Sequence, residues 1–184
     1  MSHLFPAFRK HYGPAANQVV VPPESIVRFS GLLPDPLLQI WNEVGWCSFA
    51  NGFLWLVNPD DFSEMLADWA PPKDAQVVLR TAFGDMIYWA TSAFHLVDVD
   101  YGEHSTLTVN VEVLFDYVLC PGDLLEKVLD EPIFKQALPR LGPPAEDECY
   151  GYVPAIGLGG THDPANLKKV KLREHLSILA QLHE

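Results

Sequence analysis

Lysine and arginine are scarce in this sequence. The 184 residues contain 12 of them against 24 Asp and Glu, which gives a formal net charge of −12. Binding of free nucleic acid depends on basic side chains that neutralise phosphates, so we expect no nucleic-acid partner. An anionic membrane surface is disfavoured for the same reason. A basic protein surface would be attracted instead, although a surplus of acids also simply keeps many proteins in solution.

Cysteine and long apolar segments are also in short supply. The three cysteines, Cys47, Cys120 and Cys149, are odd in number and far apart, which argues against a disulfide framework and favours a reducing compartment. No run of about 18 uninterrupted apolar residues is present, and the N-terminus does not resemble a secretory signal. We therefore expect a soluble cytoplasmic protein that does not contact a membrane. The sequence leaves its oligomeric state open.

Signatures of catalysis and of metal binding are missing as well. The chain has no Gly-x-Ser-x-Gly elbow, no CxxC or HxxxH pair, and no cysteine within a catalytic motif. The glycine-rich run 157–160 lacks the lysine-serine ending of a phosphate-binding loop. We therefore expect no catalytic residue, no metal and no cofactor. An enzyme that uses an acidic cleft stays open as an alternative.

Apolar residues make up 48% of the chain and include five Trp and ten Phe. This content is enough for one sizeable core or for two closely packed subdomains. Two stretches repeat the same helix start, in which an Asp or Asn precedes a proline and an apolar stripe follows. They predict helices over 36–44 and 59–69, with Asp35 and Asn58 as the capping residues.

Aromatic and β-branched residues alternate with turn signals through the middle of the chain. This pattern predicts a buried strand at 53–57 and then an antiparallel meander. The expected strands of the meander cover residues 77–83, 86–90, 94–101 and 105–111. The other expected elements are a short strand at 19–21 in an otherwise irregular segment 1–34, short helices at 124–129 and 132–139, a loop at 139–166 with a strand at 152–156, and a last helix from about Arg173. The predicted fold class is α+β: an antiparallel sheet meander flanked by helices, in two closely packed subdomains.

Acidic patches are the candidate binding surfaces. Residues 98–148 alone hold twelve acids and three bases, a net charge of −9. Tyrosine among carboxylates suits contact with an Arg- or Lys-rich partner, and the patch at the end of the predicted hairpin 94–111 is expected to point outward. Each patch can also be a solvated face or a polar turn. The candidate partner-binding residues are Asp60, Asp61, Glu64 and Asp68 on the predicted helix, Asp98, Asp100, Tyr101 and Glu103 at the hairpin end, and Glu146, Asp147, Glu148 and Tyr150.

Three longer motifs resemble a known family. The segment WNEVGWCSFANGFLWLVNPDDF (41–62) resembles the core of the bacterial GAD-like domain. The segments YGYVPAIGLGG (150–160) and NLKKVKLREHLSILAQL (166–182) resemble the C-terminal domain that often accompanies it. The resemblance extends over roughly residues 3–183. It implies a GAD-like domain at 1–110 and, at 111–184, the C-terminal domain of a family of bacterial immunity proteins.

That family includes type VI secretion immunity proteins, which neutralise DNase toxins in the producing cell. The resemblance therefore implies an α+β antitoxin in the cytoplasm that binds a cognate DNase and occludes its basic DNA-binding or active-site surface. It identifies no toxin contact, so the candidate residues above depend on charge and expected exposure. An acidic-cleft enzyme and a scaffold or regulatory module are the alternatives.

Overall fold

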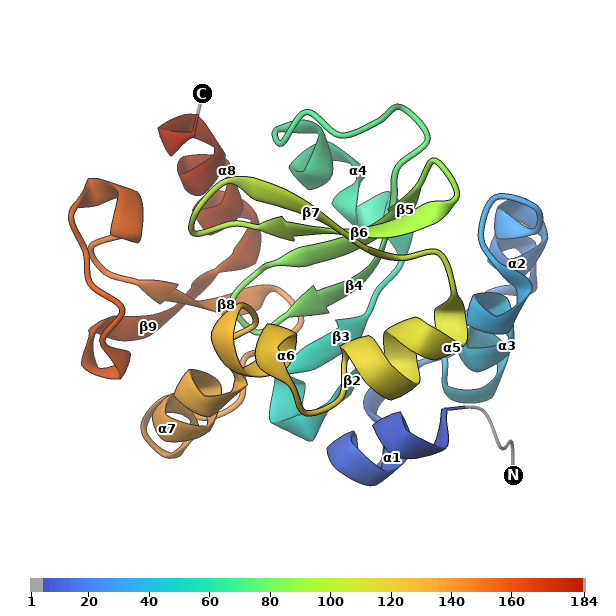
Figure 1. Cartoon of the computed structure of the whole chain (residues 1–184), viewed down its shortest axis with the longest axis horizontal. Helices are drawn as coiled ribbons and strands as arrows, with labels where there is room; N and C mark the ends of the chain where they lie inside the picture. Colours follow the sequence, from blue (N-terminus) through green and yellow to red (C-terminus); the bar gives the residue numbers. More distant parts are fainter. Residues whose placement is uncertain (1–4, 184) are drawn as a thin grey trace.

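The computed structural model describes residues 5–183, and a seven-stranded antiparallel sheet lies at its centre (Figure 1). The seven strands lie side by side in chain order, and a separate antiparallel pair, β8 and β9, follows later in the chain. This arrangement confirms the predicted α+β class and the meander. The strands are β1 (Ala16–Val19), β2 (Trp46–Phe49), β3 (Leu54–Leu56), β4 (Gln76–Thr81), β5 (Met86–Ala90), β6 (Ala93–Asp98), β7 (Glu103–Thr108), β8 (Glu148–Tyr152) and β9 (Leu167–Lys171).

Helices cover both faces of the large sheet, because side chains of successive strand residues point to opposite faces. Ile87 packs into one core cluster, while its neighbours Met86 and Tyr88 pack into the other. In Figure 1, α4 and α8 lie above the sheet, and α1, α5, α6 and α7 lie below it. The helices are α1 (Pro6–Tyr12), α2 (Pro23–Phe29), α3 (Asp35–Val44), α4 (Pro59–Ala67), α5 (Val111–Val113), α6 (Asp123–Lys127), α7 (Glu131–Leu141) and α8 (Leu172–Leu182), with short helical turns at Ala50–Gly52, Leu114–Val118, Ile156–Leu158 and Pro164–Asn166.

The two core clusters both draw on residues from before and after position 110. The first extends along the chain from Phe5 to Leu167, and the second from Trp55 to Ala180. The two predicted domains, 1–110 and 111–184, would therefore share both cores. Among the described residues, no helix is long and apolar enough to cross a membrane.

The two predicted helix starts have different outcomes. At α4 the side chain of Asn58 accepts a hydrogen bond from the backbone N–H of Asp60 at 3.3 Å, which confirms the predicted cap. At α3 the prediction is wrong, because Asp35 is already the first helical residue and the N-cap position belongs to Pro34, which has no side-chain oxygen. Gly45 ends α3 as expected, with φ of 75°.

The N-terminal segment is not irregular over residues 5–34, contrary to the prediction, and the first four residues lie outside the described range. It forms α1 and α2 on either side of β1, which lies at 16–19 rather than at 19–21. The carboxylate of Asp116 accepts hydrogen bonds from the backbone N–H groups of Ala7 and Phe8, both at 3.0 Å. The ring of Phe5 stacks on Phe115 at 4.5 Å. These contacts stabilise α1 from more than 100 residues away, so local sequence patterns do not reveal them.

Several other boundaries differ from the predicted ones. The strands at 46–49 and 167–171 and the helical segment 111–118 were not expected, and the strand expected at 152–156 lies at 148–152. Helix α7 continues through Pro139 to Leu141. The last helix begins at Leu172, close to the expected Arg173, and its apolar stripe is buried as predicted.

Candidate functional site

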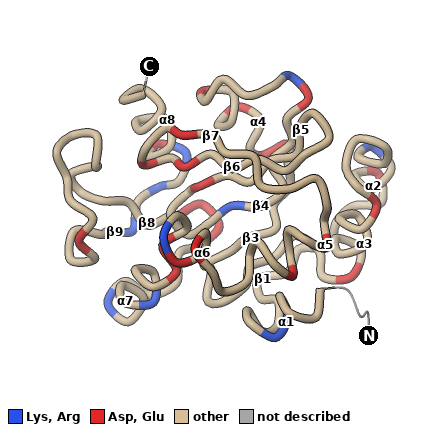
Figure 2. The backbone as a smooth tube through the Cα atoms, viewed as in Figure 1, with Lys and Arg blue, Asp and Glu red and all other residues tan. Residues whose placement is uncertain are grey.

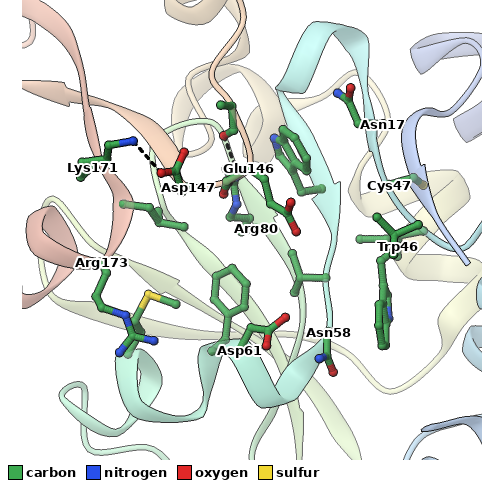
Figure 3. Close-up of a pocket in the computed structure, with 18 of the residues that line it drawn as sticks. Asn17, Trp46, Cys47, Asn58, Asp61, Arg80, Glu146, Asp147, Lys171 and Arg173 are labelled. Atoms are coloured by element: carbon green, nitrogen blue, oxygen red, sulfur yellow. Dashed lines mark hydrogen bonds and ion pairs between the residues drawn. The ribbon is translucent and has the colours of Figure 1, made fainter. Parts of the chain in front are cut away.

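A groove of about 760 Å³ opens between α4, β3 and the junction of β9 with α8 (Figure 3). Its apolar lining includes Trp55, Leu56, Val57, Phe62, Met65 and Leu172. The first five of these residues precede position 110, and Leu172 follows it. The groove therefore forms where the N-terminal and C-terminal parts of the chain meet. Its volume lies in the range of ligand-binding pockets, about 300–1,000 Å³.

Arg80 is the buried cation of this groove, with only 1% of its surface exposed. Its guanidinium Cζ lies 4.5 Å from the ring centroid of Trp55, a cation–π geometry. The guanidinium donates hydrogen bonds to the carbonyl oxygens of Thr81 (3.2 Å), Ala145 (3.3 Å) and Glu146 (2.8 Å). Burial lowers the pKa of Arg80 to about 10, so it stays charged at neutral pH. Arg80 thereby ties the segment 145–147 to the sheet.

The two cations at the rim of the groove are each paired with a carboxylate. Lys171 donates to Asp147 at 2.5 Å, and Arg173 donates to Glu64 at 2.7 Å. The hydrogen bond from Lys171 lowers the pKa of Asp147, and the same bond raises the pKa of Lys171. The positive charge at the rim is therefore already neutralised by neighbouring side chains.

The predicted patch on α4 is partly neutralised in the same way. Asp60 forms an ion pair with Arg28 of α2, and Glu64 forms the pair with Arg173. Asp61 and Asp68 stay exposed, and among the described residues no hydrogen bond or ion pair reaches their carboxylates. Asp61 lines the groove, whereas Asp68 lies at the end of α4 and does not.

In the predicted patch at 146–150, one carboxylate forms no hydrogen bond or ion pair with any described residue. Asp147 is paired with Lys171, and Glu148 accepts a hydrogen bond from the N–H of Ala145 at 3.0 Å and lies 3.7 Å from Lys169. Glu146 is exposed and lines the groove.

Tyr150 does not lie on the surface of this patch, so its expected exposure is wrong. Its side chain is 1% exposed, and its hydroxyl donates to the carbonyl oxygen of Gly142 at 2.8 Å. The ring stacks on Phe134, with ring centroids 5.3 Å apart. Tyr150 is a core residue and leaves the set of candidate contacts.

The structure thus brings two predicted patches together at one groove. Asp61 from α4 and Glu146 from the segment before β8 both line it, and within residues 5–183 neither carboxylate forms a hydrogen bond or ion pair, although the charge of Arg80 attracts that of Glu146. Glu174, in the first turn of α8, is a third such carboxylate. Glu174 was not predicted from the sequence because it sits in a locally basic stretch. Arg80 was not predicted either, although a lone charge within the apolar strand 77–83 indicates a buried cation.

The third predicted patch lies elsewhere, beside a small cavity of about 160 Å³. Asp98 and Asp100 are half-buried and line this cavity, together with Asp85 and Asp130, so their expected outward orientation is wrong. Burial, and then the negative charges of Asp98 and Asp130, raise the pKa of Asp100 to about 7. Two residues of the patch, Tyr101 and Glu103, are exposed.

The carboxylates of this cavity are held by the fold. Asp85 accepts hydrogen bonds from the Thr81 hydroxyl at 2.7 Å and from the N–H of Val99 at 3.2 Å, and burial raises its pKa well above the ordinary value. The Tyr101 ring stacks on His162, with centroids 5.7 Å apart. Within residues 5–183, no group of three or more His, Cys, Asp and Glu side chains is arranged to hold a metal ion.

Comparison with known proteins agrees with the predicted resemblance. Residues 3–101 match the family model described as GAD-like domain, and residues 110–183 match that described as T6SS immunity protein Tdi1, C-terminal. The crystal structure of Atu4351 from Agrobacterium tumefaciens is similar in fold, with a TM-score of 0.75 and 17% sequence identity over 97% of this chain and 89% of that chain. A search of curated proteins found no match.

The first of these matches covers more than half of the chain. The chain therefore belongs to the GAD-like domain family. It also carries the C-terminal domain of the type VI secretion (T6SS) immunity protein Tdi1 family.

Proposed function

We propose that this chain is a cytoplasmic immunity protein that binds and neutralises a cognate DNase effector of the type VI secretion system by occluding its basic DNA-binding or active-site surface. The observation that carries the proposal is the match of residues 110–183 to the C-terminal domain of the immunity protein Tdi1. The residues on which the contact depends are proposed from charge and exposure.

Electrostatics supports this kind of partner. A nuclease has to hold the phosphates of its substrate, so its DNA-binding surface carries basic side chains. The chain has a net charge of −12, and acidic positions occur throughout the fold (Figure 2). Such a charge attracts a basic protein from a distance and raises the association rate. The acidic chain would thereby compete with DNA for the basic surface of the nuclease.

Charge alone does not give tight binding, because exposed ion pairs contribute only about 0–1 kcal/mol each. Buried apolar contacts at the centre of an interface usually supply most of the affinity. The groove offers both kinds of contact, with apolar walls from β3 and α4 and the exposed carboxylates of Asp61 and Glu146. We therefore place the main contact there, with Asp68, Tyr101 and Glu103 as outlying contacts. The paired acids Asp60, Glu64, Asp147 and Glu148 would need to exchange partners first.

A nuclease assay tests the proposal. The product of the gene next to this one is purified, and its cleavage of plasmid DNA is measured as this chain is added. We expect cleavage to stop near a 1:1 ratio and the two proteins to migrate as one complex in size-exclusion chromatography. A neighbouring nuclease that stays fully active with excess chain would contradict the proposal.

A second candidate function is an enzyme that acts on a cationic substrate, and the small cavity is the observation that favours it. Several carboxylates with raised pKa values line that cavity, a composition typical of acid–base sites. The hydrogen bonds of Asp85 to Thr81 and Val99, however, join the turn after β4 to the end of β6, a structural role. If the wild-type protein converts a small amine to a product and the variant Asp100→Asn does not, the enzyme hypothesis would be favoured.

A further inference from the structure

We propose that the groove binds a segment of the effector in which a lysine or arginine lies next to an apolar side chain. The apolar side chain would enter between β3 and α4, and the cation would pair with Asp61 and Glu146. This inference depends on the proposed function, since it names the chemistry of the partner at the proposed contact.

The apolar part of the groove is built from rigid elements. Trp55 lies on β3, which pairs with strands on both sides, and Phe62 and Met65 project from α4. All three side chains are at least 93% buried within the chain, since their exposed fractions are 5%, 6% and 7%. An incoming side chain therefore meets a preformed surface, which reduces the entropy lost on binding.

Among the described residues, the rim charges that lack an ion pair are negative. Lys171 and Arg173 are already paired with carboxylates, and Arg80 donates to backbone carbonyl oxygens. Asp61, Glu146 and Glu174, by contrast, have no hydrogen bond or ion pair with any residue in the described range 5–183, although Arg80 attracts Glu146 and Lys171 attracts Glu174 at longer range. A cation entering the groove gains partners without breaking an existing ion pair, whereas an anion would gain none.

Asp61 and Glu146 stand on different walls of the groove. In Figure 3, Asp61 rises from α4 at the lower side of the view, Glu146 comes from the upper side, and Arg80 lies between them. The position of Glu146 is fixed by the hydrogen bond from Arg80 to its carbonyl oxygen at 2.8 Å. A chain segment that lies across the groove can therefore place its cation near carboxylates from two walls.

Other occupants fit the groove less well. A second copy of this chain would bring another net charge of −12 to an already acidic rim. A small anion would have to reach Arg80, whose surface is 99% covered by the protein itself. The effector segment is therefore the occupant to which charge and shape both point.

Binding of the intact effector to the double variant Asp61→Lys/Glu146→Lys tests this inference. The matched control is Glu112→Lys/Glu126→Lys, which changes the net charge equally at two exposed acids outside the groove. Binding kinetics are measured with the effector immobilised on a sensor surface. We expect the Kd of the groove variant to be at least about tenfold higher than that of wild type, mainly because the complex dissociates faster. The control should stay within about threefold of wild type. The isosteric variant Asp61→Asn/Glu146→Gln should raise Kd about fivefold.

The outcomes separate this inference from the proposed function. If wild type blocks the nuclease and the groove variant, folded by circular dichroism, binds as well as the control, the inference is wrong and the proposed function stands. If wild type does not block the nuclease at all, the proposed function itself fails. A wild-type dimer that the groove variant loses, measured by sedimentation, would assign the groove to a second copy and overturn the inference.

Discussion

The guanidinium of Arg80 lies over the indole ring of Trp55, with its Cζ 4.5 Å from the ring centroid, while its hydrogen bonds reach the carbonyl oxygens of residues 145 and 146. One buried cation thus joins β3 and β4 of the large sheet to the segment that leads into β8. The groove depends on this connection, because Glu146 stands on that segment.

Replacing Arg80 by lysine should therefore destabilise the protein. Lysine is a point charge without the planar fork of donors, so it cannot keep all three hydrogen bonds and the contact with Trp55. We expect the free energy of unfolding to fall by about 2–3 kcal/mol, measured by urea denaturation. The control is Arg173→Lys at the exposed ion pair with Glu64, which should cost less than about 0.5 kcal/mol. Equal effects of the two substitutions would contradict the role of Arg80.

The cavity acids predict an unusual dependence of stability on pH. Because burial raises the pKa of Asp100 to about 7, the folded protein holds this proton more tightly than the unfolded chain. Its stabilising contribution is complete below the ordinary pKa near 4 and is lost as pH rises through about 7. Asp100→Asn should thus raise the free energy of unfolding by about 3 kcal/mol more at pH 8 than near pH 4.5.

Neighbouring groups affect the whole curve, so the difference between wild type and Asp100→Asn is the quantity to measure. Burial also raises the pKa values of Asp85, Asp98 and Asp130, so the stability that these groups contribute likewise falls as pH rises. Burial of His175 lowers its pKa, which removes stability as pH falls below about 6.5 and so opposes them. A difference between the two proteins that does not vary between pH 4.5 and pH 8 would exclude a raised pKa for Asp100.

The packing of α8 against β8 leaves no room for a side chain at Gly151. A Cβ added there would lie 2.5 Å from Nε2 and 2.6 Å from Cε1 of His175. Gly151→Ala should lower the free energy of unfolding by about 1–3 kcal/mol, whereas Gly122→Ala, where the nearest atom is 3.8 Å away, should change it by less than about 1 kcal/mol. In a double-mutant cycle, His175→Ala should reduce the cost of Gly151→Ala. Additive effects would indicate that this contact is absent.

Acids outside the groove should act mainly on the rate of association. Glu103 and Asp68 are exposed and do not line the groove. The variant Glu103→Lys/Asp68→Lys should slow association with the effector about threefold at low salt and weaken the salt dependence of that rate, with little change in dissociation. Stopped-flow fluorescence measures both rates. A change confined to dissociation would instead place these residues inside the contact.

The sequence predicts the parts of the fold that local patterns determine. The meander β4–β7 follows from aromatic and β-branched residues alternating with turn signals, and helices α3, α4 and α8 follow from apolar residues at helical spacing. Both patterns lie within the elements themselves. Helix α1 does not follow from such a local pattern, because its cap comes from Asp116 and its packing from Phe115, both more than 100 residues away.

The candidate site was predictable only in part, for the same reason. Composition and spacing identified the acids, including Asp61 and Glu146. Which of them would be neutralised depends on Arg28, Lys171 and Arg173, whose positions only the fold sets. Tyr150 was assigned to the surface because of its acidic neighbours, yet β8 packs its ring into the core.

Competition between DNA and this chain for the effector tests the central claim most directly. A catalytically inactive effector is bound to a fluorescent DNA duplex, and anisotropy is followed as the chain is added. If the chain occludes the basic surface, anisotropy should fall to the value of free DNA, and excess duplex should slow the binding of the chain. A stable complex of effector, DNA and chain, with the anisotropy unchanged or raised, would contradict occlusion.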